Sequence, residues 1–407
     1  PTLKRTRRMT TMYTKPIPNL VSLLTGSAAC LLVAPSALAG STITGTTAGT
    51  PVTPSTVNVF LEPEDPVRFS VEVETDAPSE LDVFLLNDLS GSFGDDLAHV
   101  RAAVPSIVSS LTGISDNVRF GLGSFVDKPM SSFGSASSGD YVYRTELALT
   151  SDATALQTAV NSMTTKGGAD EPESQLEALF QVALRSKTEL GFRDSAYKAV
   201  ILQTDASYHK AGDGTRYGLV ANDGDTDIEA NEDYPFVEET RKALLNAGIV
   251  PIFAATSNVA SIYQNLVNQL GFGEVVTLSS NSSNLVDAIE KGIKSTLSDV
   301  KLFVESDDYN YVREIASDVT GEKTGTDLDV SGGDRAKFDV TLRDLDSDGL
   351  GENDTLYLTA AGYGRTTVHV SVPGDRASVP EPSATLGLGA IALGGLARRR
   401  RRVKSSL

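Results

Sequence analysis

Oxygen-bearing side chains are concentrated at the end of one apolar segment of the chain. The stretch LDVFLLNDLSGSFGDDLAHV (81–100) starts as an apolar run and then presents Asp88, Ser90, Ser92, Asp95 and Asp96 within nine residues. Carboxylates and hydroxyls are ligands that hard divalent cations bind. Asp and Ser are equally common in turns, so a simple acidic turn at a strand end is the alternative interpretation.

Three further acidic residues follow other predicted strands or enter a predicted helix. Asp127 follows the segment RFGLGSFV, Asp205 follows the segment ILQT, and Glu173 lies in the loop ADEPES. In an open α/β sheet the carboxyl ends of parallel strands meet at one edge, where ligands bind near the topological switch point. Without a cation, several like charges would share one crevice. The pattern therefore predicts a divalent-cation site, and the all-oxygen set favours Mg²⁺, Mn²⁺ or Ca²⁺ over zinc.

The elements that must position these residues alternate between strand and helix patterns. We predict helices from periodic apolar residues within 97–111, 176–184 and 285–297. Some of the strand segments are almost wholly apolar, as in parallel sheets covered on both faces. Residues 81–299 therefore predict an α/β fold with a doubly wound, mostly parallel sheet. The predicted strands are 82–86, 118–125, 197–204, 249–256 and 274–280.

Segments on both sides of the α/β region alternate apolar and polar residues, as half-buried strands do. We expect 56–80 and 300–372 to form one β-sandwich, with 81–299 inserted between its halves. The Thr-, Gly- and Pro-rich segment 40–55 predicts a flexible lead-in.

The N-terminal segment 1–39 resembles a secretory signal peptide. It has an apolar core after Lys15 and the small-residue sequence Ala37-Leu38-Ala39, and it holds the single cysteine, Cys30. A membrane-spanning anchor is the alternative, although Gly26 and Ser27 interrupt a short apolar run. If the segment is removed, the exported chain has no cysteine and relies on its core and bound metal for stability.

The C-terminal segment resembles the bacterial PEP-CTERM sorting tail. Residues 373–382 form a linker with the motif Pro380-Glu381-Pro382, and residues 383–407 hold a short apolar run followed by an arginine cluster. The resemblance implies transit through a membrane, recognition by an exosortase, and localisation at the cell surface or in the extracellular matrix. An ordinary C-terminal membrane anchor is the alternative.

The region between these two terminal segments has a net negative charge. Without the five basic residues of 1–39 and the six of 383–407, 24 Lys and Arg stand against 53 Asp and Glu. Such a body repels nucleic acid and anionic lipid and attracts divalent cations.

The motif DLSGSFGDD has the Asp-x-Ser-x-Ser pattern of von Willebrand factor A domains. The two acids that follow make it similar to the I-like domain of integrin β subunits, which is inserted into a hybrid domain. Supporting motifs include RFGLGSFVDKP, ADEPE, TDASYH and ATSNVASIYQNL. The resemblance covers residues 56 to about 372 and implies a metal-dependent adhesion protein rather than an enzyme.

The resemblance implies three adjoining metal sites. The central adhesion site, for Mg²⁺ or Mn²⁺, would use Asp88, Ser90, Ser92, Glu173 and Asp205. An adjacent Ca²⁺ site would use Asp95 and Asp96 with the carbonyls of Ser92 and Ser280. The third site would use Asp127, Asp170, Glu173 and the Pro172 carbonyl, with Gly168 at the position where the family has Asn.

The resemblance also implies partners: an acidic residue of a protein ligand, and an α-subunit-like chain. The family's disulfide-closed specificity loop is replaced here by GSASSGDYVYRTE, so ligand preference does not carry over. A metal-stabilised structural component of a surface or biofilm matrix is the alternative function. Metal-assisted hydrolysis is the enzyme hypothesis, although no general base beyond the ligands is evident.

Two weaker candidates complete the sequence-based analysis. The segment with Asp344, Asp346 and Asp348 begins with the pattern of a Ca²⁺-binding loop. It has no glutamate at the twelfth position of that loop, so a solvated acidic turn is the alternative. His99 and His369 lie in helix and strand patterns and are expected to be structural. His209 lies near Asp205 without a matched nucleophile.

Overall fold

The computed structural model describes residues 42–46, 51–75, 78–317, 321–324, 327–331, 335–345 and 352–373. The predicted signal peptide, the sorting tail with its PEP motif, and Asp346 and Asp348 lie outside these residues. Within the described ranges, no helix has both the length and the apolar character needed to cross a membrane.

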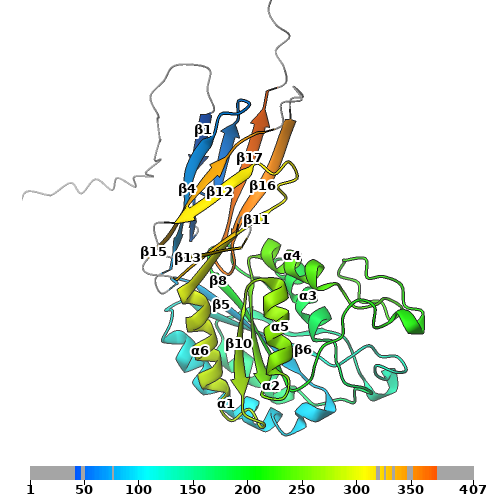
Figure 1. Ribbon diagram of the computed structural model, residues 1–407. Helices are drawn as coiled ribbons and strands as arrows, with labels where there is room; N and C mark the ends of the chain where they lie inside the picture. Colours follow the sequence, from blue (N-terminus) through cyan, green and yellow to red (C-terminus); the bar gives the residue numbers. More distant parts are fainter. Residues whose placement is uncertain are drawn as a thin grey trace, which may run out of the picture.

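A six-stranded sheet forms the centre of the α/β part (Figure 1). Its strand order is β10-β9-β8-β5-β6-β7, and all neighbours are parallel except β6 and β7. Every residue of β5 and β8 is buried, as expected for central strands covered on both faces. The strands are β5 (Leu81–Asp88), β6 (Val118–Phe125), β7 (Arg144–Thr150), β8 (Tyr197–Thr204), β9 (Val250–Thr256) and β10 (Glu274–Leu278).

Two groups of helices cover this sheet (Figure 1). In one group α1 (Leu97–Thr112) packs against α2 (Ala153–Ser162) and α6 (Leu285–Ser298). In the other, α4 (Val237–Ala247) packs against α3 (Gln175–Arg185) and α5 (Ala260–Leu270). The arrangement confirms the predicted doubly wound α/β fold.

Strands from before and after the α/β part pair with one another in two further sheets. β3 lies parallel to β17, and β4 pairs antiparallel with β15 from Val67–Leu342 to Glu74–Arg335. The first sheet holds, in order, β1 (Thr42–Thr46), β3 (Thr56–Phe60), β17 (Gly364–Val372), β16 (Glu352–Ala360), β11 (Asp299–Glu305), β14 (Asp327–Ser331) and β13 (Gly321–Thr324). The second holds β12 (Val312–Ser317), β15 (Arg335–Leu342), β4 (Val67–Glu74) and β2 (Val52–Thr53).

Within the predicted flexible lead-in, 40–55, the described residues include two short strands. β1 pairs antiparallel with β3, and β2 pairs with the end of β4. The Thr-rich composition that indicated a linker is also suited to strands, because β-branched side chains pack well on a pleated surface.

A pair of tyrosine side chains links the α/β part to the two further sheets. The Tyr363 ring, in the turn between β16 and β17, lies edge-on to that of Tyr197 at the start of β8, with centroids 4.8 Å apart. The Tyr363 hydroxyl donates a hydrogen bond of 2.8 Å to the Leu297 carbonyl near the end of α6. The last turn of α6 is therefore tied to the sheets that follow it.

Gly121 in β6 provides a test of the sheet packing. A Cβ at this position would lie 2.4 Å from Cδ2 of the buried Phe84 ring on β5. We expect Gly121→Ala to lower the free energy of unfolding by about 1–3 kcal/mol, because the ring must leave its packed position. Urea unfolding measures this change.

The matched control is Gly45→Ala in β1, where the nearest contact to a Cβ is 3.6 Å, from the Pro54 ring. Its change should stay within about 0.5 kcal/mol. Equal stability of the two variants would contradict the described packing of Phe84.

Candidate metal and ligand site

The switch point of the sheet lies between β5 and β8, because the chain adds strands to opposite sides of this pair. Asp88 is the last residue of β5, and Asp205 directly follows β8. Ser92 Oγ donates to Asp205 Oδ1 over 3.0 Å and lies 3.2 Å from Ser90 Oγ. These hydrogen bonds bring together Ser90, Ser92 and Asp205 from two segments far apart in the sequence.

Asp88 is fully buried and held by hydrogen bonds to both carboxylate oxygens. Its Oδ1 accepts from the Ser90 N–H over 2.8 Å, and its Oδ2 accepts from Thr204 Oγ1 over 2.6 Å and Gln175 Nε2 over 3.4 Å. The pKa of Asp88 is raised to about 6, mainly because the carboxyl group is buried. The sequence analysis missed Thr204 and Gln175, although Thr204 directly precedes the predicted ligand Asp205.

Glu173 reaches the same region from the loop before α3. Backbone hydrogen bonds fix this loop: the Glu173 N–H donates to the Ser207 carbonyl over 3.0 Å, and the His209 N–H donates to the Glu173 carbonyl over 2.8 Å. The side chain is 4% exposed, and its Oε2 has no hydrogen-bond partner. Burial, followed by repulsion from Asp88 and Asp127, raises the pKa of Glu173 to about 11.

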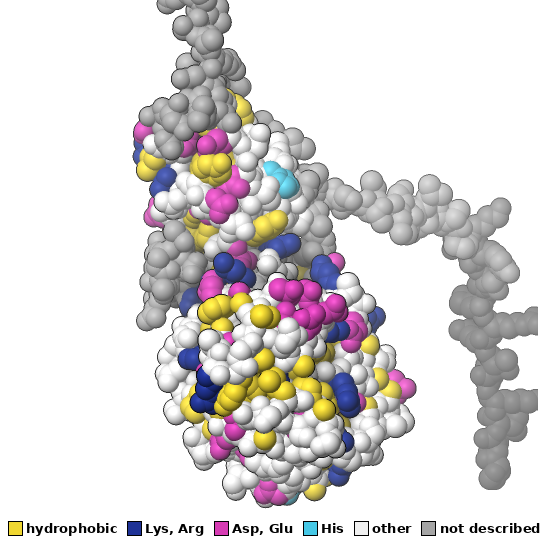
Figure 2. Space-filling model, turned by 90° about the vertical axis from the view of Figure 1, so that its right-hand side faces the viewer, with side chains coloured by type: hydrophobic (Ala, Val, Ile, Leu, Met, Phe, Trp, Pro, Cys, Tyr) yellow, Lys and Arg dark blue, Asp and Glu magenta, His cyan; other side chains and the backbone are white. Residues whose placement is uncertain are grey.

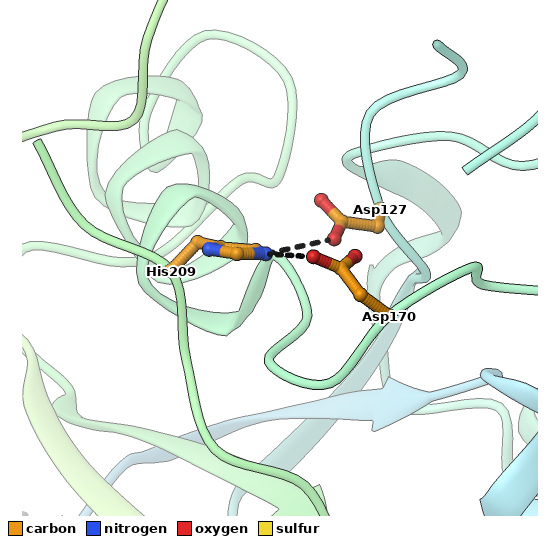
Figure 3. Close-up of side chains that lie close together, drawn as sticks. All are labelled: Asp127, Asp170 and His209. Atoms are coloured by element: carbon orange, nitrogen blue, oxygen red, sulfur yellow. Dashed lines mark ion pairs between the residues drawn. The ribbon is translucent and has the colours of Figure 1, made fainter. Parts of the chain in front are cut away.

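Asp127 and Asp170, predicted for the third site, lie together beside Glu173. Asp127 is fully buried; its Oδ1 accepts from the Lys128 N–H over 2.7 Å and from the Tyr234 hydroxyl. Burial raises the pKa of Asp127 well above its usual range, and Asp170 adds repulsion. One ligand atom each from Asp127, Asp170 and His209 lies within 4.8 Å of the others (Figure 3). Sequence reasoning placed His209 near Asp205 and missed this contact.

The loop before Glu173 differs from the family pattern at Gly168. Gly168 has a φ of 73°, and a Cβ there would lie 2.5 Å from Glu173 Oε1. The Glu173 carboxylate therefore fills the space beside Gly168, and a side chain at 168 would have to displace it. Pro172 precedes Glu173 in this loop.

The predicted adjacent site joins the start of α1 to the loop after β10. Asp96 is buried, Asp95 is exposed, and Asp96 Oδ1 accepts a 2.5 Å hydrogen bond from Ser282 Oγ. The predicted residue of this loop, Ser280, is exposed, and the side chain that makes the link belongs to Ser282, which is 1% exposed. Burial is the main cause that raises the pKa of Asp96 to about 6.

The remaining candidates are Asp344, Asp346, Asp348, His99 and His369. Asp344 is buried, whereas Asp346 and Asp348 lie outside the described residues, so the predicted Ca²⁺ loop stays a prediction. His99 is exposed on α1, and His369 on β17 pairs with Thr355 through Nδ1 over 3.0 Å.

The donor set suits a divalent cation. Asp127 Oδ2 and Glu173 Oε2 are buried carboxylate oxygens without a hydrogen-bond partner. Buried polar atoms normally have partners, and a cation would satisfy several of these oxygens at once while offsetting their repulsion. His209 places an imidazole nitrogen beside this donor set, which the sequence predicted as all oxygen.

Comparison with known proteins identifies the family of this chain. The family model described as the integrin beta chain VWA domain matches residues 75–300. The chain belongs to this family. The integrin beta-subunit resemblance and the α/β fold are therefore confirmed. A second model, the PEP-CTERM protein-sorting motif, matches residues 378–402 and indicates an exported protein.

Curated relatives are animal integrin β chains. Integrin beta-1 of Gallus gallus is 28% identical over 77% of this chain and 42% of its own length. Integrin beta-7 of Mus musculus is 31% identical over 62% of this chain and 34% of its own. The chain thus spans about a third to two-fifths of the length of these relatives.

Two solved structures show weak likeness. The pilus adhesin SpaC from Lactobacillus rhamnosus GG, in an open conformation, covers 81% of this chain and 46% of its own, with 14% identity and a TM-score of 0.33. The SpRpn10 VWA domain covers 51% and 93%, with 12% identity and a TM-score of 0.34. At these scores neither bears on the function of this chain.

The raised carboxyl pKa values predict that pH and metal act together on stability. In the folded state Asp88 and Asp96 keep their protons up to about pH 6 and Glu173 up to about pH 11, whereas unfolded carboxyls ionise near their usual values of 3.8 and 4.5. The folded state therefore binds more protons, and these groups lower the stability of the metal-free protein as pH rises above about 4. A cation replaces the protons, so its stabilising effect should grow with pH.

Thermal unfolding with Mg²⁺ or with a chelator, at about pH 5 and about pH 8, measures this effect. The increase in Tm caused by metal should be larger at about pH 8. In Glu173→Gln, a neutral amide should weaken the pH dependence. An increase in Tm that is equal at the two pH values would contradict the assignment of these carboxyls as metal ligands.

Proposed function

We propose that this chain is a metal-dependent extracellular adhesion protein that captures a carboxylate of a protein partner. Three features carry the proposal. Asp88, Ser90, Ser92 and Asp205 converge at the switch point, Glu173 adjoins them, and the fold is that of the integrin β VWA family. A Mg²⁺ or Mn²⁺ ion bound there would supply an electrophilic centre for an external carboxylate.

The chain's own residues explain why an external anion could be accepted. Ser90 and Ser92 are neutral donors, so they would leave more positive charge on a bound cation than a full ring of carboxylates would. Ser92 is exposed and Ser90 is buried, and therefore the serine pair runs from the buried Asp88 towards solvent. Thr204 and Gln175 orient Asp88 through hydrogen bonds to its Oδ2.

We further propose that flanking cations assist the central one. Ca²⁺ at Asp95 and Asp96 would stabilise the link to the loop after β10, which Ser282 makes. The same loop leads into α6, whose last turn is bonded to Tyr363. Movement of α6 could therefore couple ligand binding to the two sheets, which we assign as a hybrid-like β-sandwich.

We also propose a surface for an α-subunit-like partner. Figure 2 shows hydrophobic side chains gathered on the α/β part, with Lys or Arg side chains beside them and acidic side chains above. Exposed large apolar residues of the described chain include Tyr217, Val220 and Phe236, all between β8 and α4. Exposed apolar patches commonly mark interaction sites.

The sorting motif supports a place at the cell surface or in the extracellular matrix, after processing by an exosortase. A purely structural role for the metals in such a matrix is the competing function. It differs in one respect: it needs no open coordination position for an external carboxylate. A hydrolase would also need a residue to activate water, and assays with ester, peptide and phosphate substrates test that alternative.

Water-proton relaxation of the Mn²⁺-loaded protein separates adhesion from a structural role. We expect a short peptide with one Asp to displace a Mn²⁺-bound water and lower the relaxation enhancement, because its carboxylate takes that coordination position. The same peptide with Asn in place of Asp should have a much smaller effect.

Asp88→Ala should abolish the peptide effect. Asp194→Ala is the matched control, since Asp194 is 73% exposed and pairs only with Lys187 among the ion pairs described. It should behave like the wild-type chain. If neither peptide changes the relaxation of the wild-type protein, the structural role is favoured and carboxylate capture is wrong.

A further inference from the structure

The side chain of His209 is buried against two carboxylates without a hydrogen bond to either. Its Nε2 lies 3.5 Å from Asp127 Oδ2 and 3.6 Å from Asp170 Oδ2 (Figure 3). The side chain is 4% exposed, and Nε2 has no hydrogen-bond partner. Both distances are too long for a hydrogen bond, yet short enough for the three atoms to be ligands of one ion.

The opposite side of the imidazole ring is firmly held. Nδ1 lies 3.1 Å from Asp213 Oδ2, and this carboxylate favours the tautomer with its proton on Nδ1. The ring stacks on Tyr234, with centroids 4.6 Å apart, and meets the edge of Phe133 at 5.0 Å. The Nε2 lone pair is then directed at the carboxylates, an arrangement that is unfavourable unless a proton or a cation lies between them.

Unpartnered carboxylate oxygens also lie in this region. Asp127 Oδ2, Asp170 Oδ1 and Glu173 Oε2 are also buried without hydrogen bonds. The Lys128 ammonium, whose Nζ lies 4.6 Å over the Tyr234 ring, attracts the Asp127 carboxylate but forms no ion pair with it among those described. A buried histidine that receives support from a carboxylate on one nitrogen and offers the other to an acidic cluster has the arrangement of a metal ligand.

We propose that His209 Nε2, with Asp127, Asp170 and Glu173, forms a mixed nitrogen–oxygen site for a first-row transition metal such as Mn²⁺ or Zn²⁺. The imidazole would be a neutral side-chain ligand, which Gly168 cannot provide because it has no side chain. Imidazole shifts selectivity from Ca²⁺ towards transition metals, which bind nitrogen well. The inference rests on the proposed third site but is independent of carboxylate capture at the central one.

Pulsed electron paramagnetic resonance of the full chain loaded with Mn²⁺ tests this directly. Nitrogen bound to Mn²⁺ gives a ¹⁴N modulation, which carboxylates and water do not. We expect this modulation in the wild type and in Asp88→Ala, and its loss in His209→Gln. Excess Ca²⁺ should displace Mn²⁺ from oxygen-only sites and leave the nitrogen-coupled signal.

Asp170→Asn provides a second variant if His209→Gln does not fold, since the Asp170 side chain is 29% exposed. It should weaken Mn²⁺ binding at the nitrogen-coupled site about tenfold or more. An absent ¹⁴N modulation in the wild type, an unchanged one in His209→Gln, or its removal by Ca²⁺ would each overturn the proposal. A failed peptide experiment with the nitrogen signal intact would contradict carboxylate capture alone.

Discussion

Repulsion among buried carboxylates is the main physical constraint at the carboxyl ends of the central strands. The fold carries Asp88 and Asp205 to the switch point on two central strands and adds Glu173 and Asp127 from neighbouring loops. Burial and mutual repulsion raise their pKa values. Such an arrangement is stable only with protons or cations among the oxygens, so this architecture favours a bound cation.

The same constraint explains the hydrogen bonds around the site. Thr204 and Gln175 donate to Asp88, and Ser282 donates to Asp96, so the carboxylates of Asp88 and Asp96 are held in fixed orientations. The last of these contacts places the start of α1 beside the loop that leads into α6. At its other end, α6 is bonded to Tyr363 and through it to the flanking sheets. One helix thus spans the distance between the candidate site and the second part of the molecule.

Much of the fold could be predicted from the sequence. The strands that end at Asp88 and Thr204 each contain a continuous apolar run, at 83–86 and 199–202, as expected for strands covered on both faces. Neither β7 nor α4 was predicted from the sequence. β7 is a half-exposed antiparallel strand at the edge of the sheet, and α4 has few apolar residues from which a helical period could be recognised. β1 and β2 were missed because Thr-rich composition is shared by linkers and strands.

The site was predicted less completely. Strand ends indicated Asp88, Asp127 and Asp205 because local position suffices to place them at one edge. Ser282 and His209 depend on how distant loops pack, which no local spacing reveals. The positive φ of Gly168 and the contact beside it likewise show only in three dimensions.

The most direct test of the central claim is calorimetric titration of Mn²⁺ and Mg²⁺ into the chelator-treated protein, wild type beside Asp88→Ala. A cation site at the switch point predicts saturable binding in the wild type and the loss of one binding event in the variant. Identical titrations would contradict it: the stretch after β5 would then be only an acidic turn, and the adhesion function would lose its chemical basis.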